Sequence, residues 1–246
     1  MKPRLVSPDA IKKIAACARL TGLAALFALI SACASGPGAN PADPLESFNR
    51  GVFRFNDSVD EAVLRPVATA YRDALPTPVR TGVNNFFGNL GDVWNFANSV
   101  LQFRLQSSAE SFMRLNVNTF FGLGGLLDIA TEAGIERHNE DFGQTLGRWG
   151  VPAGAYVVLP LLGPSTVRDT VALPVDRLGD PVSHFDGGVT RASLVALRVV
   201  NTRSNFLRAS RLLDDAALDK YSFTRDAHLQ RRQNDVYDGN PPANGE

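Results

Sequence analysis

Apolar side chains recur at helical spacing along most of the chain beyond residue 43. The order Asp43-Pro44-Leu45-Glu46 is typical of a capping box, in which Asp43 caps the first turn and Glu46 lies three residues on, so a helix is predicted to begin there. Gly88 and Gly91 are expected to interrupt the helical pattern between two later helices. The spacing predicts helices over residues 67–74, 78–87, 92–103, 107–120, 189–213 and 216–233. No alternating strand pattern recurs, so the predicted fold class is mostly α.

Two uncharged segments do not fit an ordinary soluble helical domain. Residues 115–127 (LNVNTFFGLGGLL) concentrate glycine at their centre, and residues 149–167 contain three prolines and three glycines. One interpretation is that both segments are buried core with tight turns; the other is that they face lipid or line an apolar passage. Irregular backbone at membrane depth is tolerated only where protein covers it or where it lines a cavity. The second interpretation therefore predicts that residues 151–164 form an inward-facing wall.

The N-terminal residues have the order of a secretory leader. Residues 1–19 carry five basic side chains and one acidic one, and an uncharged apolar stretch follows over residues 21–30. The sequence Ile30-Ser31-Ala32-Cys33 resembles a bacterial lipobox. We expect residues 1–32 to be a lipoprotein signal peptide that is cut between Ala32 and Cys33, with acyl chains on Cys33. A retained transmembrane anchor and an ordinary signal peptide with a coincidental cysteine are the alternatives.

Removal of this leader changes the charge and the cysteine count. It takes away Cys17, five of the 25 basic residues and one of the 25 acidic residues, so the remaining chain has one cysteine and a net charge of −4. An unpaired cysteine in a secreted protein is consistent with lipidation of Cys33. No basic excess indicates nucleic acid as a partner. We expect residues 33–42 to be a lipidated flexible tether, residues 43–235 a single helical domain, and residues 236–246 a disordered tail.

The chain offers little that is typical of an enzyme. His138, His184 and His228 lie in separate polar contexts, and the sequence lacks HExxH, G-x-S-x-G and P-loop motifs. Ser165 has an aspartate four residues on, which is commonplace at a helix start. The sequence Gly122-Leu123-Gly124-Gly125 lacks the strand and the acidic partner of a nucleotide site and is interpreted as a hinge between two apolar helices. We therefore predict that the protein is not an enzyme and binds no cofactor or metal.

Long stretches of the chain match a known family. These stretches are DPLESFNR (43–50), RPVATAYRDALPTPVRTGVNNFFGNL (65–90), RLNVNTFFGLGGLLDIA (114–130) and DFGQTLGRWGVPAGAYVVLPLLGPSTVRD (141–169), with Asp176 downstream. In this order they resemble the MlaA/VacJ lipoproteins of Gram-negative outer membranes. One departure is Ala155, where the family often has proline before the tyrosine. The resemblance covers about residues 43–180.

The resemblance implies a fold and a function. It implies a ring of amphipathic helices around a central channel, in the inner leaflet of the outer membrane. Phospholipid misplaced in the outer leaflet would pass through this channel to a periplasmic carrier similar to MlaC, and the protein would also bind a trimeric porin. Residues 118–130 would be the hairpin that gates the channel, with Gly122, Gly124 and Gly125 as its hinge. A lipoprotein that binds a porin without moving lipid and a phospholipase that uses Ser165 are the alternatives.

Overall fold

The computed structural model describes residues 43–241. The expected signal peptide (1–32), the cleavage site between Ala32 and Cys33, and the tether (33–42) lie outside the described residues, as do residues 242–246. Residues 236–241 of the expected tail belong to the described part: Val236 is buried, and its carbonyl oxygen accepts a hydrogen bond of 2.9 Å from Arg104.

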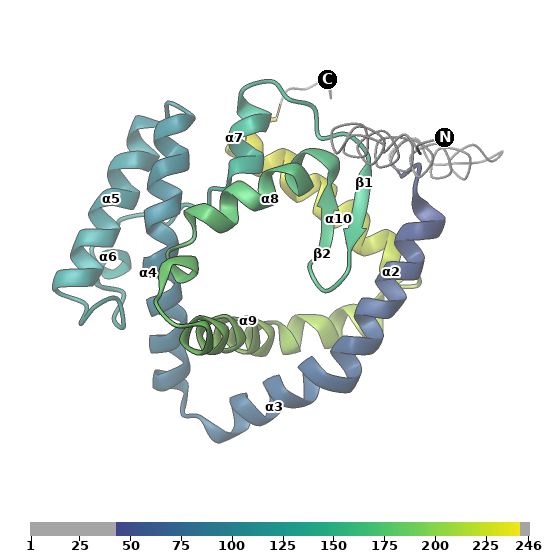
Figure 1. Ribbon diagram of the computed structural model, residues 1–246, viewed down its shortest axis with the longest axis horizontal. Helices are drawn as coiled ribbons and strands as arrows, with labels where there is room; N and C mark the ends of the chain where they lie inside the picture. Colours follow the sequence, from purple (N-terminus) through teal and green to yellow (C-terminus); the bar gives the residue numbers. More distant parts are fainter. Residues whose placement is uncertain (1–42, 242–246) are drawn as a thin grey trace, which may run out of the picture.

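The helices follow one another around the middle of the molecule (Figure 1). Helices α2 and α3 form one side together with the π-helical turn η1 that joins them, α4 and α5 lie side by side at another, and α9 runs between α3 and the middle. The helical elements are α2 (Glu46–Val59), η1 (Asp60–Leu64), α3 (Arg65–Ala74), α4 (Thr77–Leu101), α5 (Leu105–Phe120), α6 (Ile129–Glu132), α7 (Phe142–Arg148), α8 (Val167–Gly179), η2 (Pro181–His184), α9 (Gly188–Ala216) and α10 (Lys220–Val236). The prediction of a mostly α fold is confirmed. None of the described helices is both long and apolar enough to cross a membrane.

A small antiparallel hairpin was not predicted from the sequence. Strands β1 (Tyr156–Leu159) and β2 (Gly163–Thr166) pair with Tyr156 opposite Thr166 and Leu159 opposite Gly163. The hairpin projects from the side of α8 and α10 toward the middle of the molecule (Figure 1). Tyr156 and Val158 on β1 are buried, and Tyr221 of α10 packs with them. Four-residue strands are too short to show a recurring alternation of apolar and polar side chains, which explains the omission.

Two local predictions about the helices were wrong. Asp43 does not cap α2; its buried carboxylate accepts hydrogen bonds from the Asn49 amide at 2.8 Å and from the Tyr221 hydroxyl. Helix α4 continues without interruption through Gly88 and Gly91. At Gly88 a Cβ atom would lie 2.2 Å from the guanidinium of Arg137, so this glycine permits a close approach to the helix and does not end it.

The buried side chains are unusually polar. Among the largest fully buried side chains of the described residues, only Tyr156, Val158 and Val182 are apolar or aromatic. The others are Arg114, Asn49, Asn98, Asn118, Asn201, Thr145, Thr166, Asp43 and Asp92. Helix α2 illustrates the arrangement, because Asn49 is completely buried whereas Phe48 beside it is 57% exposed. Much of the interior is therefore stabilised by hydrogen bonds between buried polar groups and less by apolar contacts.

Candidate functional site

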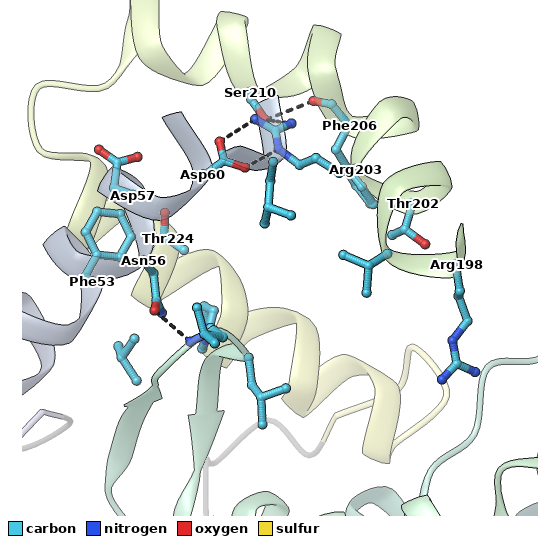
Figure 2. A pocket seen from close by; sticks show the side chains of 17 residues that line it. Phe53, Asn56, Asp57, Asp60, Arg198, Thr202, Arg203, Phe206, Ser210 and Thr224 are labelled. Atoms are coloured by element: carbon cyan, nitrogen blue, oxygen red, sulfur yellow. Dashed lines mark hydrogen bonds and ion pairs between the residues drawn. The ribbon is translucent and has the colours of Figure 1, made fainter. Parts of the chain in front are cut away.

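A cavity of about 780 Å³ lies among α2, η1, the β1–β2 hairpin, α9 and α10. Figure 2 shows side chains from these elements converging on it from several directions. Its apolar lining residues are Phe53, Leu64, Val158, Leu161, Leu162, Pro164, Val199 and Phe206. Its polar lining residues include Asn56, Asp57, Asp60, Arg198, Thr202, Arg203, Ser210 and Thr224. The cavity is therefore amphipathic and falls within the usual size range of small-molecule sites.

The polar part of the cavity is centred on an ion pair between two elements. The Arg203 guanidinium on α9 donates two hydrogen bonds to the Asp60 carboxylate on η1, at 2.6 and 2.7 Å, and a third to the Ser210 hydroxyl at 3.0 Å. Figure 2 shows Arg203 and Asp60 directed toward one another. The hydrogen bonds to Asp60 raise the pKa of Arg203, so its positive charge is permanent.

The apolar part includes the tip of the β1–β2 hairpin. Leu161 and Leu162 at this tip line the cavity, and both side chains are largely exposed. The hairpin contributes Val158 and Pro164 as well. Of residues 151–164, which were expected to form an inward-facing wall, only 158 and 161–164 line this cavity, so the expectation is met for the hairpin tip and not for residues 151–157.

The glycines singled out from the sequence lie elsewhere. Gly122, Gly124 and Gly125 belong to a tight connection between α5 and α6, and none of them lines the cavity of 780 Å³. Gly124 and Gly125 have positive φ angles of 72° and 89°. Backbone hydrogen bonds close the connection, from Gly124 N to Thr119 O at 3.0 Å and from Gly125 N to Asn118 O at 2.8 Å. The connection is therefore an ordered turn beside α4, and its gating role stays a prediction.

A buried polar cluster supports this connection. The fully buried Arg114 on α5 donates two hydrogen bonds to the Asp128 carboxylate, at 2.7 and 2.9 Å, and one to the carbonyl oxygen of Ile135. Burial by itself would raise the pKa of Asp128, but hydrogen bonds from Thr131, Asn118 and Arg114 lower it to about 2. Asp128 is thus a carboxylate that fixes the end of the connection to α5.

The outer surface carries many large apolar side chains. Phe103, the most exposed phenylalanine among the described residues, is 85% exposed. Others that are more than half exposed and do not line the cavity are Phe48, Phe55, Val63, Leu105, Phe112, Phe120, Phe121, Leu123, Trp149, Val171, Leu178, Val189, Leu212, Leu218 and Phe223. Large exposed apolar surfaces mark sites that contact a membrane or another protein. Together with the polar interior, these side chains reverse the distribution usual in a soluble domain, where large apolar side chains are mostly buried and polar ones mostly exposed.

Ser165 lacks the surroundings of a catalytic nucleophile. Its hydroxyl group interacts with the Thr170 hydroxyl at 3.0 Å and with the carbonyl oxygen of Thr166 at 3.3 Å. Asp169, the downstream carboxylate, is bound by Arg168 and Arg232. Within residues 43–241, no histidine or carboxylate is hydrogen-bonded to Ser165. A nucleophile needs a base within hydrogen-bond reach, and this geometry supplies none.

The exposed apolar side chains, the polar interior and the amphipathic cavity are together typical of a helical protein that associates with a membrane. The model of the MlaA lipoprotein family matches residues 41–235, and the chain belongs to this family. The resemblance seen in the sequence is therefore confirmed.

Curated relatives and a solved structure agree with this assignment. The Escherichia coli protein named intermembrane phospholipid transport system lipoprotein MlaA is 36% identical over 219 residues, which are 87% of this chain and 86% of that protein. The Haemophilus influenzae protein of the same name is 34% identical over 201 residues, 80% of each chain. A solved structure described as the structural basis for maintenance of bacterial outer membrane lipid asymmetry has a TM-score of 0.69 and 36% identity, and the match covers 80% of this chain and 99% of that one.

Proposed function

We propose that this protein is the outer-membrane lipoprotein of an intermembrane phospholipid transport system. It removes mislocalised phospholipid from the outer leaflet and passes it through an amphipathic channel toward the periplasm, which maintains the lipid asymmetry of the membrane. The names of the relatives and the family of the chain support this function. The cavity among α2, α9 and the β1–β2 hairpin is the part of the channel that we assign to the lipid in transit.

The observation that carries the proposal is the reversed distribution of polar and apolar side chains. Outward-facing phenylalanines and leucines match the acyl region of one leaflet, whereas the cavity offers both apolar and charged walls. Two acyl chains stranded in water would cost on the order of 20 kcal/mol, and a headgroup in hydrocarbon costs several more. A passage with both kinds of wall lowers both costs at once.

The remaining parts of the proposal concern attachment and partners. Acyl chains on Cys33 hold the protein at the periplasm-facing leaflet of the outer membrane, and two or more chains are needed for stable anchoring. A trimeric porin positions the protein in the membrane, and a periplasmic carrier similar to MlaC accepts the lipid. The protein works passively and is not an enzyme. The connection with Gly122, Gly124 and Gly125 gates the passage.

Mass spectrometry of the protein extracted from membranes in mild detergent tests this function. We expect acyl chains on Cys33 and intact phospholipid that co-purifies without covalent attachment. Acylated protein without bound phospholipid would contradict lipid transport and favour a lipoprotein that only binds a porin. Lysophospholipid products would instead contradict the passive mechanism. A Phe55→Glu variant, which places a charge on the exposed face of α2, should weaken membrane association and leave the cavity intact.

A further inference from the structure

In the Asp60–Arg203 ion pair of the cavity, a carboxylate binds the guanidinium through two hydrogen bonds. A carboxylate on the two-pronged face of an arginine has the same geometry as a phosphate at that place. Asp60 therefore fills the position on Arg203 that an incoming phosphate would take. The hydroxyl groups of Thr202 and Thr224 also line the cavity, and within the described part of the chain neither one forms a hydrogen bond.

Asp60 has a second arginine within reach. The Nε atom of Arg65 lies 3.6 Å from the Asp60 carboxylate, too far for a hydrogen bond. This Nε–H group is buried and has no hydrogen-bond partner among residues 43–241. A buried donor without a partner costs about 1–3 kcal/mol. A small movement of Asp60 toward Arg65 would satisfy that donor and release the guanidinium of Arg203.

The π-helical turn η1 accounts for this placement. It begins at Asp60, and the backbone N–H of Arg65 donates to the carbonyl oxygen of Asp60, five residues earlier. In an α-helix, residues five apart diverge around the axis, whereas the wider π turn brings them to neighbouring faces. Single π turns of this kind are frequent at functional sites.

We propose that Arg203 binds the phosphate group of a phospholipid in the cavity, and that Asp60 moves from Arg203 to Arg65 as the phosphate arrives. This inference rests on the proposed transport function and names the headgroup site within it. Each charge keeps a partner throughout the exchange, so the lipid enters and leaves without exposing an unpaired arginine to the apolar wall. Asp57 also lines the cavity and repels free phosphate, whereas the ammonium group of a zwitterionic headgroup offsets that repulsion.

Binding of short-chain lipids to the full lipoprotein in detergent tests the exchange. The probes are dihexanoyl phosphatidylethanolamine, dihexanoylglycerol, which lacks the phosphate, and inorganic phosphate. Arg203→Gln should weaken binding of the phospholipid at least about tenfold, because the two charge-assisted hydrogen bonds to the phosphate are lost, and leave binding of dihexanoylglycerol unchanged. Asp60→Asn should strengthen phospholipid binding roughly threefold or more, because the competing carboxylate is gone.

A purely structural ion pair gives the opposite pattern. In that case Asp60→Asn and Arg203→Gln both weaken binding of both lipids, and the proposal fails. Arg203→Lys keeps the positive charge without the two-pronged geometry and replaces Arg203→Gln if that variant does not fold. Arg50→Gln is the matched control, since it removes another bidentate pair on α2, with Asp219, away from the cavity lining.

The role of Arg65 has its own test. Arg65→Gln removes the second partner of Asp60 and should weaken phospholipid binding several-fold, because Asp60 then stays on Arg203. Lys220→Gln is the control: Lys220 and Arg65 both pair with Asp214, but only Arg65 also approaches Asp60. Equal effects of the two variants would overturn the exchange.

The remaining outcomes separate this inference from the transport function. Wild-type protein that binds inorganic phosphate as tightly as the phospholipid would overturn the assignment to a lipid headgroup. Phospholipid binding that is independent of Arg203 would overturn this inference alone and leave the transport function standing. A wild-type protein that binds no phospholipid at all would contradict both.

Discussion

Asn49 and Asn56 lie two turns apart on α2, and each side-chain amide forms two hydrogen bonds with the backbone of the β1–β2 hairpin. Asn49 donates to the carbonyl oxygen of Tyr156 and accepts from the amide of Val158. Asn56 donates to the carbonyl oxygen of Leu159 and accepts from the amide of Leu161. The two amides therefore act as a neighbouring strand would, and they hold the hairpin tip at the cavity.

We predict that the two asparagines differ in their contribution to stability. Asn49→Leu leaves two buried backbone groups of β1 without partners and should lower the free energy of unfolding by about 2–5 kcal/mol. Asn56→Leu acts at the partly exposed tip, where water can replace the amide, so its cost should be about 1 kcal/mol. Chemical denaturation in detergent, followed by circular dichroism, measures both. Equal losses would show that the tip is not accessible to water.

The Arg114–Asp128 pair should dominate the stability of the connection between α5 and α6. Arg114→Met removes the arginine that is hydrogen-bonded to Asp128 and leaves Asp128 and the buried Asp92 only the more distant Arg137, at 3.5 and 3.9 Å, so it should cost about 3 kcal/mol. Because the pKa of Asp128 is lowered to about 2, its contribution is complete above its ordinary pKa and is lost as the pH falls through about 2.

Asp128→Asn isolates the part that depends on pH. The lowered pKa corresponds to about 2 kcal/mol, which wild type should lose between pH 5 and pH 2 and the variant should not. Unfolding measured at several pH values between these limits gives the difference. Parallel curves for wild type and variant would contradict the assignment of this acid sensitivity to Asp128.

The three glycines of the connection should respond differently to substitution by alanine. A Cβ atom at Gly122 would lie 2.3 Å from the carbonyl oxygen of Leu127, and one at Gly125 would lie 2.7 Å from Asn89, whereas Gly124 faces open space. We therefore expect stability losses in the order Gly122→Ala, Gly125→Ala, Gly124→Ala, with about 1 kcal/mol for the last because of its positive φ. Thermal unfolding ranks the variants.

Gly124→Ala is consequently the best test of the proposed gate. It restricts the backbone without a steric clash, so the protein should fold while phospholipid transfer from outer-membrane vesicles to the carrier slows. Gly134→Ala is the matched control, since Gly134 also has a positive φ and open space but lies beyond α6. The same transfer rate in both variants would contradict a hinge at Gly124.

The longest helices could be predicted from the sequence because their apolar spacing is regular, whereas the shorter α7 and α8 were not predicted. The orientation of the helix faces could not be predicted either. Spacing alone gives Phe48 and Asn49 adjacent positions on α2 and does not say which of them faces inward. In a soluble protein Phe48 would be buried; here it is exposed and Asn49 is fully buried. A glycine within a helical pattern can either end the helix or permit a close contact with another side chain. Gly88 does the second, because Arg137 approaches it within an unbroken helix.

The cavity could not be predicted from the sequence, for a different reason. Asp60 and Arg203 are 143 residues apart and belong to no recognisable motif. Their pairing depends on the π-helical turn, which no residue pattern marks, and on the path of α9 past η1. Of the cavity lining, the sequence indicated only the segment around Leu161 and Leu162. This segment is uncharged and rich in proline and glycine, and irregular backbone at membrane depth must be covered by protein or line a cavity.

His228 should make the fold sensitive to mild acid. Its ring lies beside Tyr156, its Nε2 atom is buried without a hydrogen-bond partner in the described part of the chain, and burial together with the charge of Arg232 lowers its pKa. The unfolded chain therefore takes up a proton as the pH falls below about 6.5 while the folded chain does not, so stability falls by at most about 1.4 kcal/mol per pH unit. Unfolding at pH 7.5 and pH 5.5 should show a smaller difference for His228→Gln than for wild type. His184→Gln, at an exposed histidine, should keep the wild-type difference, and equal behaviour of all three proteins would assign the sensitivity to other groups.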